Sequence, residues 1–319
     1  MNATRGHNRP LLLPAPLEPG DTIALFCPSG PVRDSEAVQT GIDWLHQQGY
    51  RVQSSCNVYG TIPEEEYLAG PDADRAEELH RLWLDKNIKA LWAVRGGFGC
   101  LRLLELLDFD LFCKNPKLVI GFSDVTGLLA ALATRSGLIS LHGPVMSTVA
   151  NSKKRNRSQL ATILQGTYKL NTMTCEVPRP GTATGQLVVG NLTTLVHLMA
   201  TPWEPDLNQA ILVIEDTGES LYRVDRMLTH LSLAGRLDTL AGLILARFDH
   251  GRGRNFTKEE QKQLIQRALF LTRKCACPLW SGFPLGHGRD NQPLPFGMAA
   301  TMNEQGALVL HPELCRKGK

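Results

Sequence analysis

The order of structural elements that defines the fold can be read from the stretch Lys117-Leu118-Val119-Ile120-Gly121-Phe122-Ser123-Asp124-Val125. It begins with a short apolar run, turns at residues 121–124 and continues into an apolar, alanine-rich segment at residues 125–134. A short apolar run that ends at a turn is typical of a buried strand, and the segment after it has the composition of a helix. The stretch therefore predicts one strand–turn–helix unit.

The same order of elements occurs earlier in the chain. An apolar run at 22–26 predicts a strand, and the spacing of apolar residues at 35–48 predicts an amphipathic helix. A second helix is predicted at 74–85 and a second strand at 90–94, before the glycine-rich turn 96–99. Alternating strands and helices predict a parallel, doubly wound α/β sheet.

The length of 319 residues favours two domains. Residues 156–184 are rich in polar residues, proline and glycine, which predicts a linker between an N-terminal domain at 18–155 and a C-terminal domain at 185–319. Apolar runs at 212–214 and 243–245 predict strands in the second domain. We therefore expect two α/β domains.

Composition excludes several classes of protein. Apolar residues make up 43% and charged residues 20% of the chain, as in ordinary globular proteins. The net charge is only +3 and the densest basic stretch, 153–157, is short, so we expect a solvated loop there and no nucleic-acid partner. No apolar run approaches the roughly 18 residues of a membrane span, and prolines interrupt the first apolar residues. A soluble, cytoplasmic protein is predicted.

The eight cysteines are scattered through the chain, unlike the dense framework of a small secreted domain. We expect them to be reduced thiols. The pair Cys275 and Cys277 has no second pair or histidine cluster nearby, so no metal site is predicted.

Ser123 is a candidate nucleophile because it stands between a predicted strand and a predicted helix, where the side chains of an α/β sheet meet substrate. This is the position of the serine in a G-x-S-x-G elbow, although the second glycine is missing. Serine is also among the best helix N-cap residues, and from this turn alone a capping role is the favoured interpretation.

Candidate acids and bases follow other predicted strands. Glu215 and Asp216 end the run 212–214, and either could orient a base or could simply be a solvated carboxylate. His287, in a glycine-flanked loop, and His142 are alternative general bases, since imidazole titrates near neutral pH. The residues alone leave both choices open.

The turn Gly96-Gly97-Phe98-Gly99 could offer backbone N–H groups to an anion, either a phosphate or an oxyanion. Cys100 and Leu101 follow it where a P-loop requires lysine and then serine or threonine, so a Walker site is excluded. The glycine spacing does not fit a dinucleotide fingerprint either.

Taken in order, the motifs of the chain resemble those of the LD-carboxypeptidase family of serine peptidases, which includes muramoyl-tetrapeptide carboxypeptidases and microcin C immunity peptidases. The resemblance covers nearly the whole chain, except for the first seventeen residues, to which we assign no function. The matching motifs lie at 20–24, 28–30, 68–72, 94–99, 121–124, 142–144, 190–192, 201–203, 212–216, 222–228 and 286–287.

The resemblance implies a catalytic triad of Ser123, Glu215 and His287, with His287 and not His142 as the base. It also implies an oxyanion hole formed by the Gly96-Gly97 turn and the amide of Asp124. By the same resemblance, the site lies at the interface of two domains, needs no metal or cofactor, and belongs to a homodimer.

The expected activity is serine carboxypeptidase hydrolysis of an L,D-peptide bond, which releases terminal D-alanine from a murein tetrapeptide during cell-wall peptide recycling. Two alternatives remain. One is cleavage of a peptidyl-nucleotide antibiotic of the microcin C type, and the other is a non-catalytic α/β protein that binds an anion at the Gly96–Gly99 turn.

Overall fold

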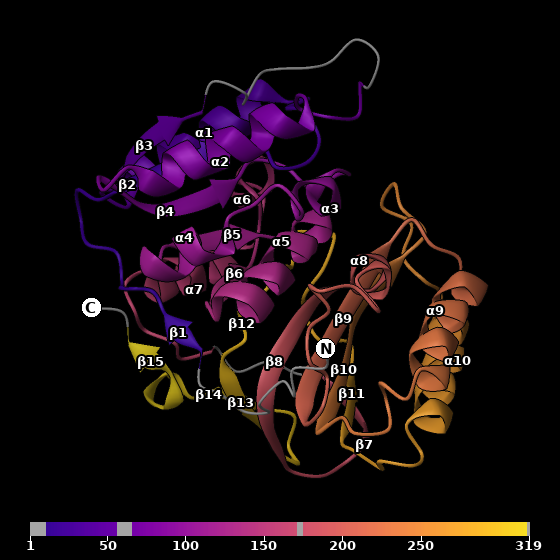
Figure 1. Ribbon diagram of the computed structural model, residues 1–319. Helices are drawn as coiled ribbons and strands as arrows, with labels where there is room; N and C mark the ends of the chain where they lie inside the picture. Colours follow the sequence, from indigo (N-terminus) through magenta and orange to yellow (C-terminus); the bar gives the residue numbers. More distant parts are fainter. Residues whose placement is uncertain (1–10, 56–65, 171–174, 318–319) are drawn as a thin grey trace.

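The computed structural model describes residues 11–55, 66–170 and 175–317, and its elements form two units built on separate β-sheets (Figure 1). Both sheets are largely parallel and carry helices, which confirms the predicted α/β class. None of the helices in the described part of the chain combines the length and apolar composition needed to cross a bilayer.

The first sheet has six strands in the order β12-β6-β5-β4-β2-β3. All neighbouring pairs are parallel except β12 with β6. Its strands are β2 (Thr22–Phe26), β3 (Arg51–Ser54), β4 (Ile88–Ala93), β5 (Leu118–Gly121), β6 (Ser140–His142) and β12 (Leu294–Phe296). Its helices are α1 (Ser35–Gln47), α2 (Asp72–Leu84), α3 (Cys100–Leu103), α4 (Phe109–Lys114), α5 (Thr126–Ala131), α6 (Met146–Val149) and α7 (Lys154–Leu164).

The central strands of this sheet read as continuous apolar runs because both of their faces are buried. In β2, Ile23 and Leu25 belong to the core beneath α1, α6 and α7, whereas Ala24 and Phe26 belong to the core beneath α2. This alternation follows from the two-residue side-chain period of a strand. Helices on both faces therefore leave the carboxyl edge of the sheet as the place where polar side chains can collect.

The second sheet has seven strands in the order β14-β13-β8-β9-β10-β11-β7. The four strands β8 to β11 run parallel, while β7, β13 and β14 join the edges antiparallel. The strands are β7 (Glu176–Arg179), β8 (Ala183–Asn191), β9 (Ala210–Thr217), β10 (Gly242–Asp249), β11 (Leu279–Ser281), β13 (Ala299–Met302) and β14 (Leu308–Leu310). Its helices are α8 (Leu192–His197), α9 (Leu221–Leu233) and α10 (Lys258–Leu271), and α9 and α10 lie on the side away from the first unit (Figure 1).

The prediction of a linker at 156–184 is wrong. Most of α7 lies in this range and packs into the first core, and β7 pairs with β11 in the second sheet. Both elements are polar because α7 buries only one face and β7 is an edge strand, so their composition resembles that of a loop. The basic stretch 153–157 is likewise the first turn of α7 and not a loop.

Residues 185–319, which we predicted to form the C-terminal domain, do not all stay in the second unit. Strand β12 returns to the first sheet, where Leu294 pairs with His142, before β13 and β14 complete the second sheet. In addition, β1 (Leu12–Leu13) near the start of the described chain pairs with β15 (Arg316–Lys317) near its end. The two units are thus linked by more than one crossing of the chain.

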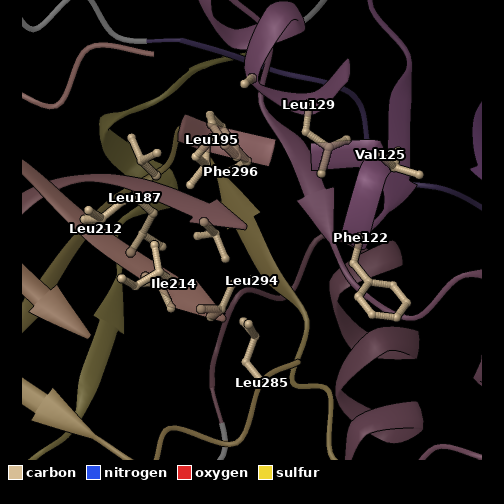
Figure 2. Close-up of a cluster of buried hydrophobic side chains, with 14 of the residues drawn as sticks. Phe122, Val125, Leu129, Leu187, Leu195, Leu212, Ile214, Leu285, Leu294 and Phe296 are labelled. Atoms are coloured by element: carbon tan, nitrogen blue, oxygen red, sulfur yellow. The ribbon is translucent and has the colours of Figure 1, made fainter. Parts of the chain in front are cut away.

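Apolar packing joins the units next to the carboxyl ends of the parallel strands (Figure 2). Val125 and Leu129 come from the first unit, and Leu187 and Ile214 come from the second. Gly190 lies at the closest approach, where an added Cβ would be 2.2 Å from the Thr126 Cγ2 atom. The segment from Val125 to Leu129 and strands β8 and β9 are therefore held together by a shared core.

Candidate active site

Ser123 stands on a sharp turn between β5 and α5. It has a φ of +63°, in the left-handed region that residues other than glycine seldom adopt. Room for it comes from Gly96, where an added Cβ would lie 2.9 Å from the Ser123 Cβ. The capping interpretation is wrong, because Phe122 and not Ser123 precedes the short 3₁₀ turn Ser123–Val125. The Ser123 hydroxyl therefore caps no helix and is available to bond to another side chain.

His287 connects Ser123 to Glu215. Its Nε2 atom lies 2.9 Å from the Ser123 hydroxyl oxygen, and its Nδ1 atom lies 2.7 Å from a carboxylate oxygen of Glu215. Glu215 is fully buried in β9, and His287 lies in the connection from β11 to β12. Gly286, before His287, has a φ of +130°, and an added Cβ there would lie 3.1 Å from the Glu215 carboxylate. The structure thus brings together three predicted residues from separate elements.

Glu215 and Asp216 are both buried, so the interpretation of them as solvated carboxylates is wrong. Their carboxylates have different partners. Asp216 accepts hydrogen bonds from the Thr193 amide and hydroxyl at 2.8 and 2.7 Å, whereas Glu215 contacts His287. Burial, together with the nearby charge of Glu215, raises the pKa of Asp216 to about 6. Asp216 holds the start of α8, and only Glu215 reaches the imidazole.

Asn191 is a site residue for which no role was predicted, although it lies in the matching motif at 190–192. Its side-chain amide donates to Glu215 at 3.3 Å and to Asp216 at 3.0 Å, and its side-chain oxygen caps α8 by accepting from Thr194. The available signal was its place at the carboxyl end of β8, beside the ends of the strands that carry the acids. Asn191 fixes both carboxylates relative to the second sheet.

His142, the alternative base, lies at the end of β6 and is fully buried. Its ring is 5.9 Å from the Phe122 ring, and neither of its nitrogens has a hydrogen-bond partner among the described residues. Burial lowers the pKa of His142 to about 4. A neutral, enclosed imidazole that does not bond to Ser123 is poorly placed to accept its proton.

The Gly96–Gly97 turn lies against the Ser123 side chain, and Asp124 is the next residue in the chain. Gly97 has a φ of +118°, and the Gly96 carbonyl accepts a bond from the Gly30 amide at 3.1 Å. The Asp124 carboxylate accepts from the Ser29 hydroxyl at 2.7 Å and from the Cys100 amide at 2.8 Å. These bonds fix the two turns that flank the hydroxyl, so their backbone N–H groups have fixed directions.

The pKa of His287 reflects opposing effects. Burial of the ring lowers it, but the negative charge of Glu215 and its hydrogen bond to the ring raise it, and the charges of Asp249 and Asp216 add to this. The net result is a pKa above the ordinary value of 6.5. The buried carboxylate therefore makes the imidazole a stronger base.

This raised pKa predicts a pH profile. A base must be unprotonated to accept the serine proton, so kcat/KM is expected to rise with pH and to reach half of its maximum above pH 6.5. Steady-state rates of the wild type between about pH 5 and 9 measure the midpoint. A profile that is flat over this range, or that falls as the pH rises through it, would contradict the role of His287.

Metal ligands do not gather anywhere in the described part of the chain: no group of three His, Cys, Asp or Glu side chains there is arranged to hold an ion. None of the seven described cysteines belongs to a disulfide, and Cys56 lies outside the described residues.

Comparison with known families defines the chain as an α/β peptidase. Residues 23–143 match the LD-carboxypeptidase N-terminal domain, and residues 184–302 match the LD-carboxypeptidase C-terminal domain. These two matches cover more than half of the sequence. The chain belongs to the LD-carboxypeptidase family, peptidase family S66.

Relatives of similar length carry carboxypeptidase or immunity names. A putative carboxypeptidase of Synechocystis sp. is 38% identical over 92% of this chain and 94% of its own. A probable murein peptide carboxypeptidase of Bacillus subtilis is 33% identical over 91% of each chain. The microcin C7 self-immunity protein MccF of Escherichia coli is 27% identical over 90% of this chain and 92% of its own.

Solved structures from both branches share the fold. A muramoyltetrapeptide carboxypeptidase from Oxalobacter formigenes superposes with a TM-score of 0.75 at 30% identity, over 91% of this chain and 97% of its own. The wild-type microcin C7 self-immunity protein MccF superposes with a TM-score of 0.81 at 25% identity, over 94% of this chain and 98% of its own.

Proposed function

We propose that this peptidase is a serine carboxypeptidase that hydrolyses the L,D-peptide bond before the terminal D-alanine of a murein tetrapeptide. The observation that carries the proposal is the relay of hydrogen bonds from Ser123 through His287 to Glu215, at 2.9 and 2.7 Å. A hydroxyl, an imidazole and a buried carboxylate in this order make up the machinery of serine hydrolysis, whatever the fold.

In the first half of the reaction, His287 Nε2 accepts the proton of Ser123 as the hydroxyl oxygen attacks the carbonyl carbon. Glu215 accepts a hydrogen bond from His287 Nδ1, which fixes the tautomer and stabilises the imidazolium. The tetrahedral intermediate then collapses, the C–N bond breaks, and the imidazolium gives its proton to the amine of the departing D-alanine. An acyl-enzyme on Ser123 remains.

In the second half, His287 takes a proton from a water molecule as the water oxygen attacks the acyl carbon. The bond between that carbon and the Ser123 oxygen then breaks, His287 returns the proton to the Ser123 oxygen, and the shortened peptide leaves with a new carboxyl group. Two backbone donors, one from the Gly96–Gly97 turn and one from Asp124, are assigned to the oxyanion in both halves. Such donors commonly contribute about 3 kcal/mol each. The bonds that fix Asp124 and Gly96 support this assignment, because fixed donors need no reorganisation as charge develops.

The choice of substrate rests on similarity. The murein peptide carboxypeptidase relative is 33% identical to this chain and the self-immunity relative is 27% identical, which favours a murein peptide. The alternative is a peptidyl-nucleotide of the microcin C type, which the same triad could cleave, since the chemistry at the carbonyl is shared. The homodimer and the cytoplasmic location stay predictions.

Mass spectrometry on the two substrates tests the proposal. The protein is expected to remove one alanine from a murein tetrapeptide and to leave a peptidyl-nucleotide intact at equal enzyme concentration. Cleavage of the nucleotide conjugate alone would assign the chain to the alternative substrate. No product from either compound, together with no labelling of Ser123 by a fluorophosphonate, would favour a non-catalytic anion-binding protein.

A further inference from the structure

His287 lies on a long connection between the two sheets. This connection, residues 282–293, leaves β11 in the second sheet and enters β12 in the first. Bonds within it close the chain around His287: the Gly286 amide donates to the Asn291 side chain at 3.2 Å, and the Gln292 amide donates to the Pro284 carbonyl at 2.8 Å. These bonds shape the loop, but they do not set its distance from Ser123.

Asp290, three residues after His287, ties this loop to the first unit. Its carboxylate accepts from Lys153 Nζ at 2.7 Å, from Arg155 Nε at 3.2 Å and from Asn156 Nδ2 at 3.2 Å. A second guanidinium nitrogen of Arg155 also bonds to it. The three donor residues all lie at the start of α7. The Asp290 carboxylate thus joins the His287 loop to one end of a single helix.

Two further hydrogen bonds to backbone carbonyls reinforce the same junction. The Lys153 amide donates to the Arg289 carbonyl at 2.7 Å, and Arg289 Nε donates to the Asn151 carbonyl at 3.1 Å. Burial alone would raise the pKa of Asp290, but the hydrogen bonds from Lys153, Arg155 and Asn156 hold it below its usual value. The carboxylate therefore stays charged at neutral pH, where it also complements the positive end of the α7 dipole.

An isolated surface ion pair contributes little, because solvent screens it and its side chains lose freedom. The Asp290 junction differs in having several donors on one carboxylate that is only 22% exposed, with a backbone bond from Lys153 to the preceding residue, Arg289. Multiple charge-assisted bonds restrain direction as well as distance.

We propose that Asp290 is a positioning residue that clamps the His287 loop onto α7 and so keeps His287 Nε2 within hydrogen-bonding distance of Ser123. Glu215 holds the imidazole from the second sheet, and Asp290 holds its loop against the first unit, which carries the nucleophile. The proposal rests on the serine mechanism above. It requires that a loss of Asp290 affects the chemical step more than substrate binding.

Replacing Asp290 by alanine is expected to lower kcat by about 10- to 100-fold, as misplacement of a catalytic group by about 1 Å can do, with KM changed by less than about threefold. Asp290→Asn keeps the shape but loses the charge, and it is expected to lie between the wild type and the alanine variant. The matched control is Asp238→Ala, which removes a carboxylate paired with Lys274 at 2.8 Å in the second unit and is expected to retain wild-type kcat.

A fluorophosphonate probe separates this proposal from the choice of substrate, because its rate of reaction with Ser123 depends on the Ser–His pair and needs no peptide. The labelling rate of folded Asp290→Ala is expected to fall in parallel with kcat. A merely structural role would lower the melting temperature while leaving the labelling rate of the folded fraction unchanged. An unlabelled wild type would reject the serine mechanism, and the role of Asp290 with it.

The donors on α7 give an independent test. Lys153→Ala combined with Arg155→Ala is expected to slow labelling about as much as Asp290→Ala, and adding Asp290→Ala to that pair is expected to slow it little further. Wild-type labelling by the folded Asp290→Ala and Asp290→Asn proteins would overturn the proposal while leaving the triad intact. The proposal would also be overturned if the losses of labelling rate caused by the Lys153→Ala/Arg155→Ala pair and by Asp290→Ala were fully additive.

Discussion

The Ser123→Ala protein is expected to fold normally and to show no measurable turnover. Loss of a nucleophile that acts as a unit with its base lowers kcat by about 10⁶-fold, because only binding and oxyanion stabilisation remain. The fold loses one hydrogen bond to His287, a contribution of about 1 kcal/mol, and the left-handed backbone at residue 123 is no worse for alanine than for serine. Steady-state kinetics and thermal melting measure both expectations.

Two controls make the Ser123 test decisive. Ser232→Ala removes a serine of α9, outside the site, and is expected to retain full activity. Fluorophosphonate labelling is expected in the wild type and in Ser232→Ala, and to be absent in Ser123→Ala. A folded Ser123→Ala protein with wild-type turnover would remove the serine mechanism.

Local pattern was sufficient to predict the strand–turn–helix units, because parallel strands buried on both faces leave uninterrupted apolar runs. Strands β2, β4 and β5 lie where those runs predict them. Local pattern did not predict the polar helices and strands. Helix α7 and strand β7 carry few apolar residues because each is covered on one side only, and composition therefore made them resemble a linker.

Sequence also could not rank the two histidines from local context, since each follows a short apolar segment. What separates them is three-dimensional: β6 encloses His142 within the first sheet, while the β11–β12 connection brings His287 across to Ser123. The same is true of Asp290, whose contact with the basic residues of α7 spans more than 130 positions of the chain. Contacts of that kind depend on how the chain crosses between units, which no short motif encodes.

Glu215→Gln is expected to lower kcat by roughly 10³- to 10⁴-fold with little change in KM, because an amide can impose the wrong imidazole tautomer and cannot stabilise the imidazolium. Its effect on stability is expected to be small, since glutamine has the same shape and its oxygen can still accept a bond from Asn191 or His287. Kinetics and melting of the folded variant measure the two effects separately.

Asp216→Asn is expected to reduce stability clearly and kcat only slightly. The two Asp216 oxygens accept four hydrogen bonds, from the Asn191 side chain, the Thr217 amide, and the amide and hydroxyl of Thr193. An amide nitrogen in place of Oδ1 would face two N–H donors, and one in place of Oδ2 would face the Thr193 amide, although the Thr193 hydroxyl could turn to accept from it. Lost bonds of this kind cost about 1 to 3 kcal/mol of stability. Because Asp216 does not contact His287, kcat is expected to stay within about tenfold of the wild type. A severe kinetic defect in Asp216→Asn beside a nearly normal Glu215→Gln would reverse the assignment of the acid.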